Sequence, residues 1–232
     1  MDYNSTNQPY VYSDSTSAEP LGKYTAKTFG WMFAGLLITF LVAMFGYTTG
    51  TIIYVFAIPY AYLVLGVAEI AVVIFLSARI SKMSVGTARA LFFTYAILNG
   101  IVFSAYFLVD LILVFGATSI FFGVMAVIGY VTNADFSRIR NFLMGGLIFL
   151  VVFWVLSMFI NLGQFELIVC YIGIFIFLGF TAYDTQKIRA YHQYYAQDQD
   201  MAAKASIFSA LQLYLDFVNL FLYIIRIVGR RK

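Results

Sequence analysis

Residues 171–189 read YIGIFIFLGFTAYDTQKIR, and this segment decides the fold class. Its apolar part is long enough to cross a bilayer, and it ends in polar residues followed by Lys187 and Arg189. Basic residues anchor the end of a membrane span in the headgroups, but the carboxylate of Asp184 is costly there unless another group receives it. Asp216, in the middle of the last apolar segment, is the candidate receiver. We therefore interpret the sequence as a membrane protein with two intramembrane aspartates on consecutive spans.

The composition supports an all-α, polytopic membrane protein. Of the 232 residues, 62% are hydrophobic and 11% are charged, whereas soluble domains have about 25% charged residues. A soluble fold could not bury so much apolar surface, so the lipid bilayer is the expected solvent. The formal net charge of +3 is small. No basic patch is interleaved with aromatic residues, which argues against nucleic-acid binding.

Metal and disulfide chemistry have little support in the sequence. The single cysteine, Cys170, lies inside an apolar run, so neither an internal disulfide nor a thiolate metal site is expected. The single histidine, His192, falls in a polar stretch, and we expect it to be solvated and without a ligand. We predict no zinc site and no cofactor.

We expect two regions in the chain. Residues 1–22 are polar, contain Pro9 and Pro20, and are predicted to be a disordered tail. Residues 23–232 are predicted to be a single transmembrane domain of seven helices. The expected spans are 29–47, 52–77, two within 90–131, 142–160, 167–186 and 206–228.

Two details of these spans follow from the residues inside them. Pro59 removes a backbone hydrogen bond, so a kink is predicted in the outer half of the second span. At 1.5 Å per residue, the run 90–131 is roughly twice as long as the bilayer core is thick, so it must contain two spans. Asp110 and residues 116–118 are expected to mark the turn between them.

The basic residues predict the orientation of the protein. The loops expected on the same side of the membrane as the amino terminus contain Lys23, Lys27, Arg79, Lys82, Arg89, Arg138, Arg140, Lys187, Arg189 and Lys204. The loops on the opposite side contain no lysine or arginine. The positive-inside rule therefore predicts a cytoplasmic amino terminus. A seventh full span places Arg226, Arg230, Arg231 and Lys232 outside, against the rule. The alternative is a last segment that re-enters the membrane and returns.

The last apolar segment carries a polar stripe. At 100° per residue, Gln212, Asp216, Asn219, Tyr223 and Arg226 fall within an arc of about 80°. Such a stripe must face protein or water instead of lipid. It either holds helices together by hydrogen bonds or lines a polar cavity. The aspartate in the middle of the membrane favours the cavity.

Three carboxylates are expected in the cytoplasmic half of the membrane. Glu69 precedes Arg79 by ten residues, or roughly 15 Å of helix, Asp216 is about as far from Ser206, and Asp184 is nearer the edge. Glu69 is either part of the site or paired locally. Two carboxylates in a low-dielectric site cannot both ionise cheaply and titrate as a unit. When ionised they offer the hard oxygen ligands that calcium prefers.

Three segments resemble the Bax inhibitor family, which includes the bacterial YccA-like proteins. They are GFTAYDTQKI at 179–188, LYLDFVNLFLYIIRIVGRR at 213–231 and SARISKMSVGTARALFFTYAILNG at 77–100. The resemblance implies seven helices with the last one central, in a bacterial inner membrane. It also implies a pH-sensitive calcium leak controlled by an aspartate pair, here Asp184 and Asp216. Arg79 is the nearest match to the arginine that latches this pair in the family, and other members are described as regulators of cell death or of a membrane-bound protease.

Enzymatic functions fit the sequence less well. Intramembrane aspartyl proteases also carry a Tyr-Asp on one helix and an aspartate on the next, but their second aspartate follows Gly-x-Gly. Here bulky residues, Leu213, Tyr214 and Leu215, precede Asp216. Rhomboid-type serine proteases use a Gly-x-Ser-Gly motif and an intramembrane histidine, and this sequence has neither. We expect a protein that is not an enzyme, and a non-catalytic regulator of another membrane protein stays open beside the leak channel.

Overall fold

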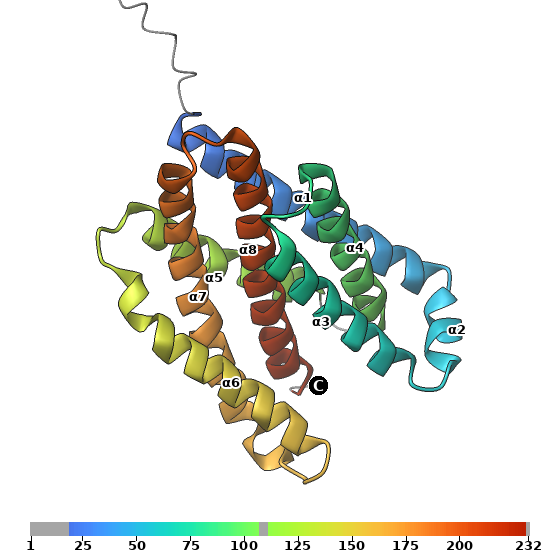
Figure 1. Cartoon of the computed structure of the whole chain (residues 1–232). Coiled ribbons are helices and arrows are strands. Elements are labelled where there is room, and N and C mark those ends of the chain that lie inside the picture. The colour runs from blue at the N-terminus through green and yellow to red at the C-terminus, as the bar shows by residue number, and fades with distance from the viewer. Residues whose placement is uncertain (1–18, 107–110, 231–232) are drawn as a thin grey trace, which may run out of the picture.

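The computed structural model describes residues 19–106 and 111–230, and within them the chain is helical without any strand (Figure 1). Of the tail predicted at 1–22, residues 1–18 lie outside these residues, as does Asp110 of a predicted turn, whereas Leu21 and Gly22 already belong to the first helix. The α-helices are α1 (Leu21–Thr48), α2 (Thr51–Ala57), α3 (Ala61–Arg79), α4 (Val85–Phe103), α5 (Leu111–Val131), α6 (Arg140–Ser157), α7 (Glu166–Tyr194) and α8 (Gln199–Gly229). Short 3-10 turns, η1 (Ser104–Tyr106), η2 (Phe136–Ile139) and η3 (Gly163–Phe165), lie between them.

The structure confirms an all-α membrane protein. In the described residues, six helices are long and apolar enough to cross a membrane, namely α1 and α4 to α8. Seven spans were predicted, and the difference lies in the second, at 52–77. That segment does not form one kinked helix, because it is divided into α2 and α3. The seven-span count therefore stays a prediction.

Pro59 explains the division between α2 and α3. A proline disfavours helical backbone at the residue before it, and Ile58 is extended, with φ −72° and ψ 124°. Tyr60 then adopts a left-handed conformation with φ 62°. Non-helical backbone on both sides of Pro59 therefore breaks the helix completely instead of kinking it.

Two other boundaries differ from the predicted ones. Residues 116–118 lie inside α5, so the turn predicted there is wrong. The polar stretch after residue 190 is mostly helical, because α7 continues to Tyr194 and α8 begins at Gln199. Asp198 starts α8 by accepting a hydrogen bond from the Met201 amide at 2.9 Å, as an N-cap aspartate does.

Helix α8 forms the interior of the bundle. It packs against α1, α4, α5 and α7, and Figure 1 shows it in the middle of the view with α6 at the edge. Of the most apolar 18 residues of α8, 56% are buried, against 11% for α6. Buried hydrogen bonds tie α8 to α1, from Tyr214 to Thr39 at 2.6 Å and from Ser206 to Thr28 at 2.9 Å. The last helix is therefore surrounded by helices that precede it in the chain.

A small residue allows the closest approach between α5 and α7. A Cβ placed on Gly129 of α5 would lie 2.3 Å from the carbonyl oxygen of Ala182 on α7. That oxygen is backbone and cannot move aside, so only glycine fits. Close contacts through small residues are typical of helices that associate within membranes. This contact fixes the position of α7 against α5 at Ala182, two residues before Asp184.

Candidate functional site

Asp184 and Asp216 lie on α7 and α8, which pack against each other. Their exposed fractions are 5% and 4%. The Oδ1 atom of Asp184 and the Oδ2 atom of Asp216 are buried without a hydrogen-bond partner in the described residues. The two carboxylates are close enough to interact electrostatically. Buried carboxylate oxygens without partners are costly, so this arrangement is unusual for a purely structural site.

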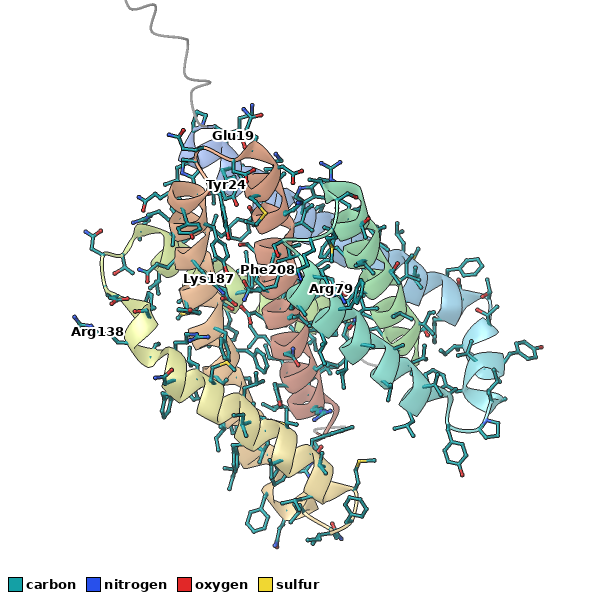
Figure 2. The ribbon with its side chains drawn as sticks, viewed as in Figure 1. Glu19, Tyr24, Arg79, Arg138, Lys187 and Phe208 are labelled. Carbon is teal, nitrogen blue, oxygen red and sulfur yellow. The ribbon has the colours of Figure 1, made fainter. Side chains whose placement is uncertain are left out.

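Lys187 is the cation nearest to the pair. Its Nζ lies 3.8 Å from Oδ1 of Asp184, one turn earlier on α7, and donates a hydrogen bond to Oε1 of Gln212 on α8 at 3.2 Å. Figure 2 shows Lys187 between these two helices. The rings of Tyr183, Tyr191 and Phe208 surround the ammonium at 5.3 to 5.8 Å from their centroids, a distance typical of cation–π contacts.

Sequence reasoning assigned Lys187 to anchoring in the headgroups and to setting the orientation, and not to the aspartate pair. The signal that could have found it is its i,i+3 spacing from Asp184, because residues three apart on a helix share a face. Arg140, the first residue of α6, adds a second positive charge within electrostatic range of Asp184. Two basic groups, one from α7 and one from α6, therefore lie within electrostatic range of Asp184.

The family resemblance implied that Arg79 interacts with the aspartate pair, but the structure does not show this interaction. It ends α3 and is exposed, and Figure 2 shows it away from α7. In the described ranges, no ion pair joins Arg79 to Asp184 or Asp216, and Lys187 makes the ion pair with Asp184.

Glu69 belongs to a different polar cluster. It is half-buried on α3, its Oε1 has no hydrogen-bond partner in the part of the chain that the structure describes, and it interacts electrostatically with Tyr95 and Tyr214. Tyr214 and Asp216 are two residues apart and therefore point to different sides of α8. The structure thus brings Asp184 and Asp216 together but places Glu69 on the other side of α8.

The cluster around Glu69 was not predicted from the sequence. The Tyr214 hydroxyl lies 2.6 Å from the Thr39 hydroxyl, which in turn donates to the Ala96 carbonyl at 2.9 Å. The rings of Tyr95 and Tyr214 meet edge to face with centroids 5.6 Å apart. Neither a tyrosine nor a threonine stands out in a hydropathy pattern, so only the fold reveals that these hydroxyls meet.

The predicted polar stripe of α8 faces α7 and a cavity. Gln212 binds Lys187 as described above, and the Asn219 side chain donates to the Leu215 carbonyl of its own helix at 2.8 Å. Tyr223 stacks on Phe177 of α7 with ring centroids 6.0 Å apart. Asn219, Tyr223 and Arg226 also line a cavity of about 500 Å³ between α6, α7 and α8. The stripe therefore faces protein and the cavity, as a polar stripe in a membrane requires.

Neither His192 nor Cys170 was expected to bind a metal ion. His192 is not in a solvated loop, contrary to the prediction, because α7 extends through it. Its Nε2 lies 2.5 Å from the Glu19 carbonyl oxygen, and its ring is 5.3 Å from that of Tyr24. Cys170 is buried. In residues 19–106 and 111–230, no group of three or more His, Cys, Asp or Glu side chains is placed to hold a metal ion.

The fold and the site define a class: an all-helical integral membrane protein with two buried aspartates between its two most buried spans. Comparison with known proteins identifies it further. The chain belongs to the Bax inhibitor family, since the family described as "Inhibitor of apoptosis-promoting Bax1" matches residues 21–232.

Similar proteins come from distant bacteria. The inner membrane protein YbhL of Escherichia coli is 37% identical over 91% of this chain and 93% of its own length. A protein of Deinococcus radiodurans is 34% identical over 97% of both chains. A protein of Borreliella burgdorferi is 33% identical over 90% of this chain and 93% of its own. The similarity thus covers the whole helical domain.

Proposed function

We propose that this protein is a pH-sensitive cation leak channel, with calcium as the permeant ion, and that the Asp184–Asp216 pair is its gate. The observation that carries the proposal is the pair of buried carboxylates on adjoining helices, each with an oxygen that lacks a hydrogen-bond partner in the described residues. Oxygens without partners can accept a shared proton or a hard cation. The proposed activity needs no covalent chemistry, so the protein acts as a channel and not as an enzyme.

The gate follows from the chemistry of the pair. At low pH the two carboxylates share at least one proton, and a shared proton forms a short, strong hydrogen bond that ties α7 to α8. As pH rises, the pair loses this proton and both groups are charged. Repulsion between them then separates the two helices, and their oxygens attract a divalent cation. The leak therefore grows with pH and levels off when the pair is fully ionised.

The neighbouring groups have supporting roles. Lys187 offsets part of the negative charge and links Asp184 to Gln212 across the helix interface. Asn219 and Tyr223 extend the polar stripe from the pair into the cavity. Glu69 and Arg79 are accessory groups, outside the contacts of the pair.

We further propose a bacterial inner-membrane location with seven spans and a cytoplasmic amino terminus. YbhL, the relative from Escherichia coli, is named as an inner membrane protein. In this topology α3 is the second of the seven spans. Its 19 residues are about 28 Å long and contain only Glu69 and Arg79 as charged groups, which is close to the thickness of the hydrocarbon core.

The test is calcium flux from liposomes that contain only the purified protein, between about pH 5 and pH 8. We expect the wild-type flux to rise with pH. Asp184→Asn and Asp216→Asn each remove one partner of the pair, so each should flatten the pH dependence whatever the height of the flux. Asp135→Asn is the matched control, because Asp135 is an exposed aspartate that precedes η2.

Four outcomes would count against the proposal or change it. A flux that ignores pH, or aspartate variants that keep the full pH response, would end it. A flux that falls as pH rises would keep the sensor and reverse the direction of gating. A folded protein that passes no calcium at any pH would favour the alternative function, a regulator of another membrane protein such as a membrane-bound protease.

A further inference from the structure

The cavity between α6, α7 and α8 has two kinds of lining. Its walls are mostly apolar and include Leu150, Val151 and Trp154 of α6 and Leu222 of α8. Its polar lining includes Glu166, at the start of α7, and Arg226, near the end of α8. Its volume of about 500 Å³ lies in the range of roughly 300 to 1,000 Å³ that is usual for ligand pockets.

The polar end of the cavity carries a positive charge, Arg226, that has no carboxylate partner in the described residues. Glu166 pairs with Arg230 at 3.0 Å, so these two charges offset each other. Arg226 lies 5.8 Å from the centre of the Tyr223 ring, and in the described residues no carboxylate is within ion-pair distance of its guanidinium. The cavity therefore favours a ligand with a negative group at this end.

The position of Arg226 along α8 matches the depth of a lipid headgroup. It lies three residues before Gly229, where α8 ends, or roughly 5 Å of helix. The cavity extends from there toward the middle of the membrane, to Asn219, which is seven residues or roughly 10 Å deeper. A ligand that fills it would have its negative group at the interface and its apolar part in the membrane.

The cavity is also accessible from the lipid phase. Helix α6 packs mainly against α7, and it is the least buried of the six spans. Two residues of α6 that line the cavity, Val151 and Trp154, have exposed fractions of 54% and 51%. An occupant can therefore enter sideways from the bilayer.

From these observations we propose that the cavity is a binding site for an anionic phospholipid. The lipid phosphate binds the Arg226 guanidinium, and one acyl chain lies against the apolar wall of α6 and α8. An arginine suits this role because its planar guanidinium can bind two phosphate oxygens at once. The proposal is argued from the charge and the lining of the cavity and does not require the leak activity, although Asn219 and Tyr223 of the polar stripe line the same cavity.

The experiment uses Trp154 as a reporter, because it lines the cavity and the chain has only one other tryptophan. In a Trp31→Phe background, the protein is placed in vesicles of phosphatidylcholine and phosphatidylglycerol, and the acyl chains of one lipid at a time are brominated. Bromine quenches the fluorescence of a nearby tryptophan. We expect phosphatidylglycerol to bind beside Trp154 about fivefold more strongly than phosphatidylcholine, the ratio that corresponds to about 1 kcal/mol for one basic side chain near an anionic lipid.

Three variants test the site. Arg226→Gln should bring the ratio close to one. Val151→Phe should also lower it, by filling the cavity while Arg226 stays in place. Arg138→Gln should leave it unchanged, because Arg138 is an exposed arginine at the other end of α6, as Figure 2 shows. Each variant is first shown to be monodisperse in detergent, so that a loss of the lipid preference cannot be caused by misfolding.

The proposal is overturned by any of three results. A ratio close to one in the starting protein means that the cavity does not select the headgroup. A ratio that Arg226→Gln leaves intact means that another group causes the preference. Millimolar inorganic phosphate that abolishes the ratio means that the site binds a free anion and that the lipid tail contributes nothing.

Discussion

The Lys187 ammonium lies 3.8 Å from the carboxylate of Asp184, on the same face of α7. In the part of the chain that the structure describes, neither Asp184 nor Asp216 makes another ion pair. The lysine side chain is 23% exposed. The attraction between opposite charges is stronger there than in water, because the surroundings have a lower dielectric constant. The charge state of the aspartate pair therefore depends on Lys187.

The first prediction concerns this lysine. Lys187→Met should move the midpoint of the pH-dependent calcium leak to higher pH, because the ionised pair loses its nearest positive charge and forms less readily. The measurement is the same liposome flux assay between about pH 5 and pH 8. Lys82→Met is the control, since Lys82 is exposed in the turn after α3. An unchanged midpoint in Lys187→Met would show that the lysine has no influence on the gate.

The second prediction tests the contact between α5 and α7. Gly129→Ala should lower the thermal stability of the protein in detergent by about 1 to 3 kcal/mol, the usual cost of overpacking, because the new Cβ would lie 2.3 Å from the Ala182 carbonyl oxygen. Gly123→Ala is the matched control on the same helix, since nothing lies within 4 Å of a Cβ at that position. Equal melting temperatures for the two variants would contradict the close contact.

The third prediction separates two roles for the polar stripe. The side chain of Asn219 donates to a carbonyl of its own helix, so Asn219→Leu should lower the calcium flux while the melting temperature stays near that of the wild type. If the stripe instead held helices together, stability would fall by about 1 kcal/mol or less, and flux per folded molecule would be unchanged. Flux and melting curves from one preparation decide between the two.

The fourth prediction concerns orientation. With Cys170 replaced by alanine, a cysteine at Gly163 should react with a membrane-impermeant thiol reagent in intact cells. A cysteine at Gln199, the first residue of α8, should react only after the cells are opened. Both positions are exposed. Labelling of Gln199→Cys in intact cells would contradict the cytoplasmic amino terminus.

The fifth prediction decides the number of spans. Thr49 precedes α2 and Ser81 follows α3, and both are exposed. In the same background, Thr49→Cys should react from outside and Ser81→Cys only from inside, if α3 crosses the membrane. If both cysteines react from the same side, α3 does not cross the membrane and the protein has six spans.

Much of the fold could be predicted from the sequence because apolar runs of about 20 residues have few structural solutions. The central position of α8 was implied by the resemblance to the Bax inhibitor family, and the stripe from Gln212 to Arg226, which had to face protein or water, agrees with it. The ends of α7 and α8 could not be predicted in this way. Both helices continue into polar residues, where hydropathy gives no signal and local caps such as Asp198 decide the boundary.

The pairing within the site was harder to predict than its main residues. Asp184 and Asp216 stand out because carboxylates are rare in membrane spans. The basic partner depends on helix rotation and side-chain reach, and a resemblance to the family pointed to Arg79 where the structure has Lys187. Glu69 lies at a suitable depth but interacts electrostatically with Tyr95 and Tyr214, because depth along a helix does not determine which neighbour a side chain meets.

The interior position of α8 has a consequence for biosynthesis. Its hydrogen bonds to α1 join residues 175 and 178 positions apart in the chain, and α8 leaves the ribosome after every helix that it packs against. The earlier helices must therefore wait in the membrane around an incomplete centre, with the Thr28 and Thr39 hydroxyls still lacking their partners on α8. A nascent chain that stalls before α8 would lack both Asp216 and the buried side chains of α8 that fill the centre of the bundle.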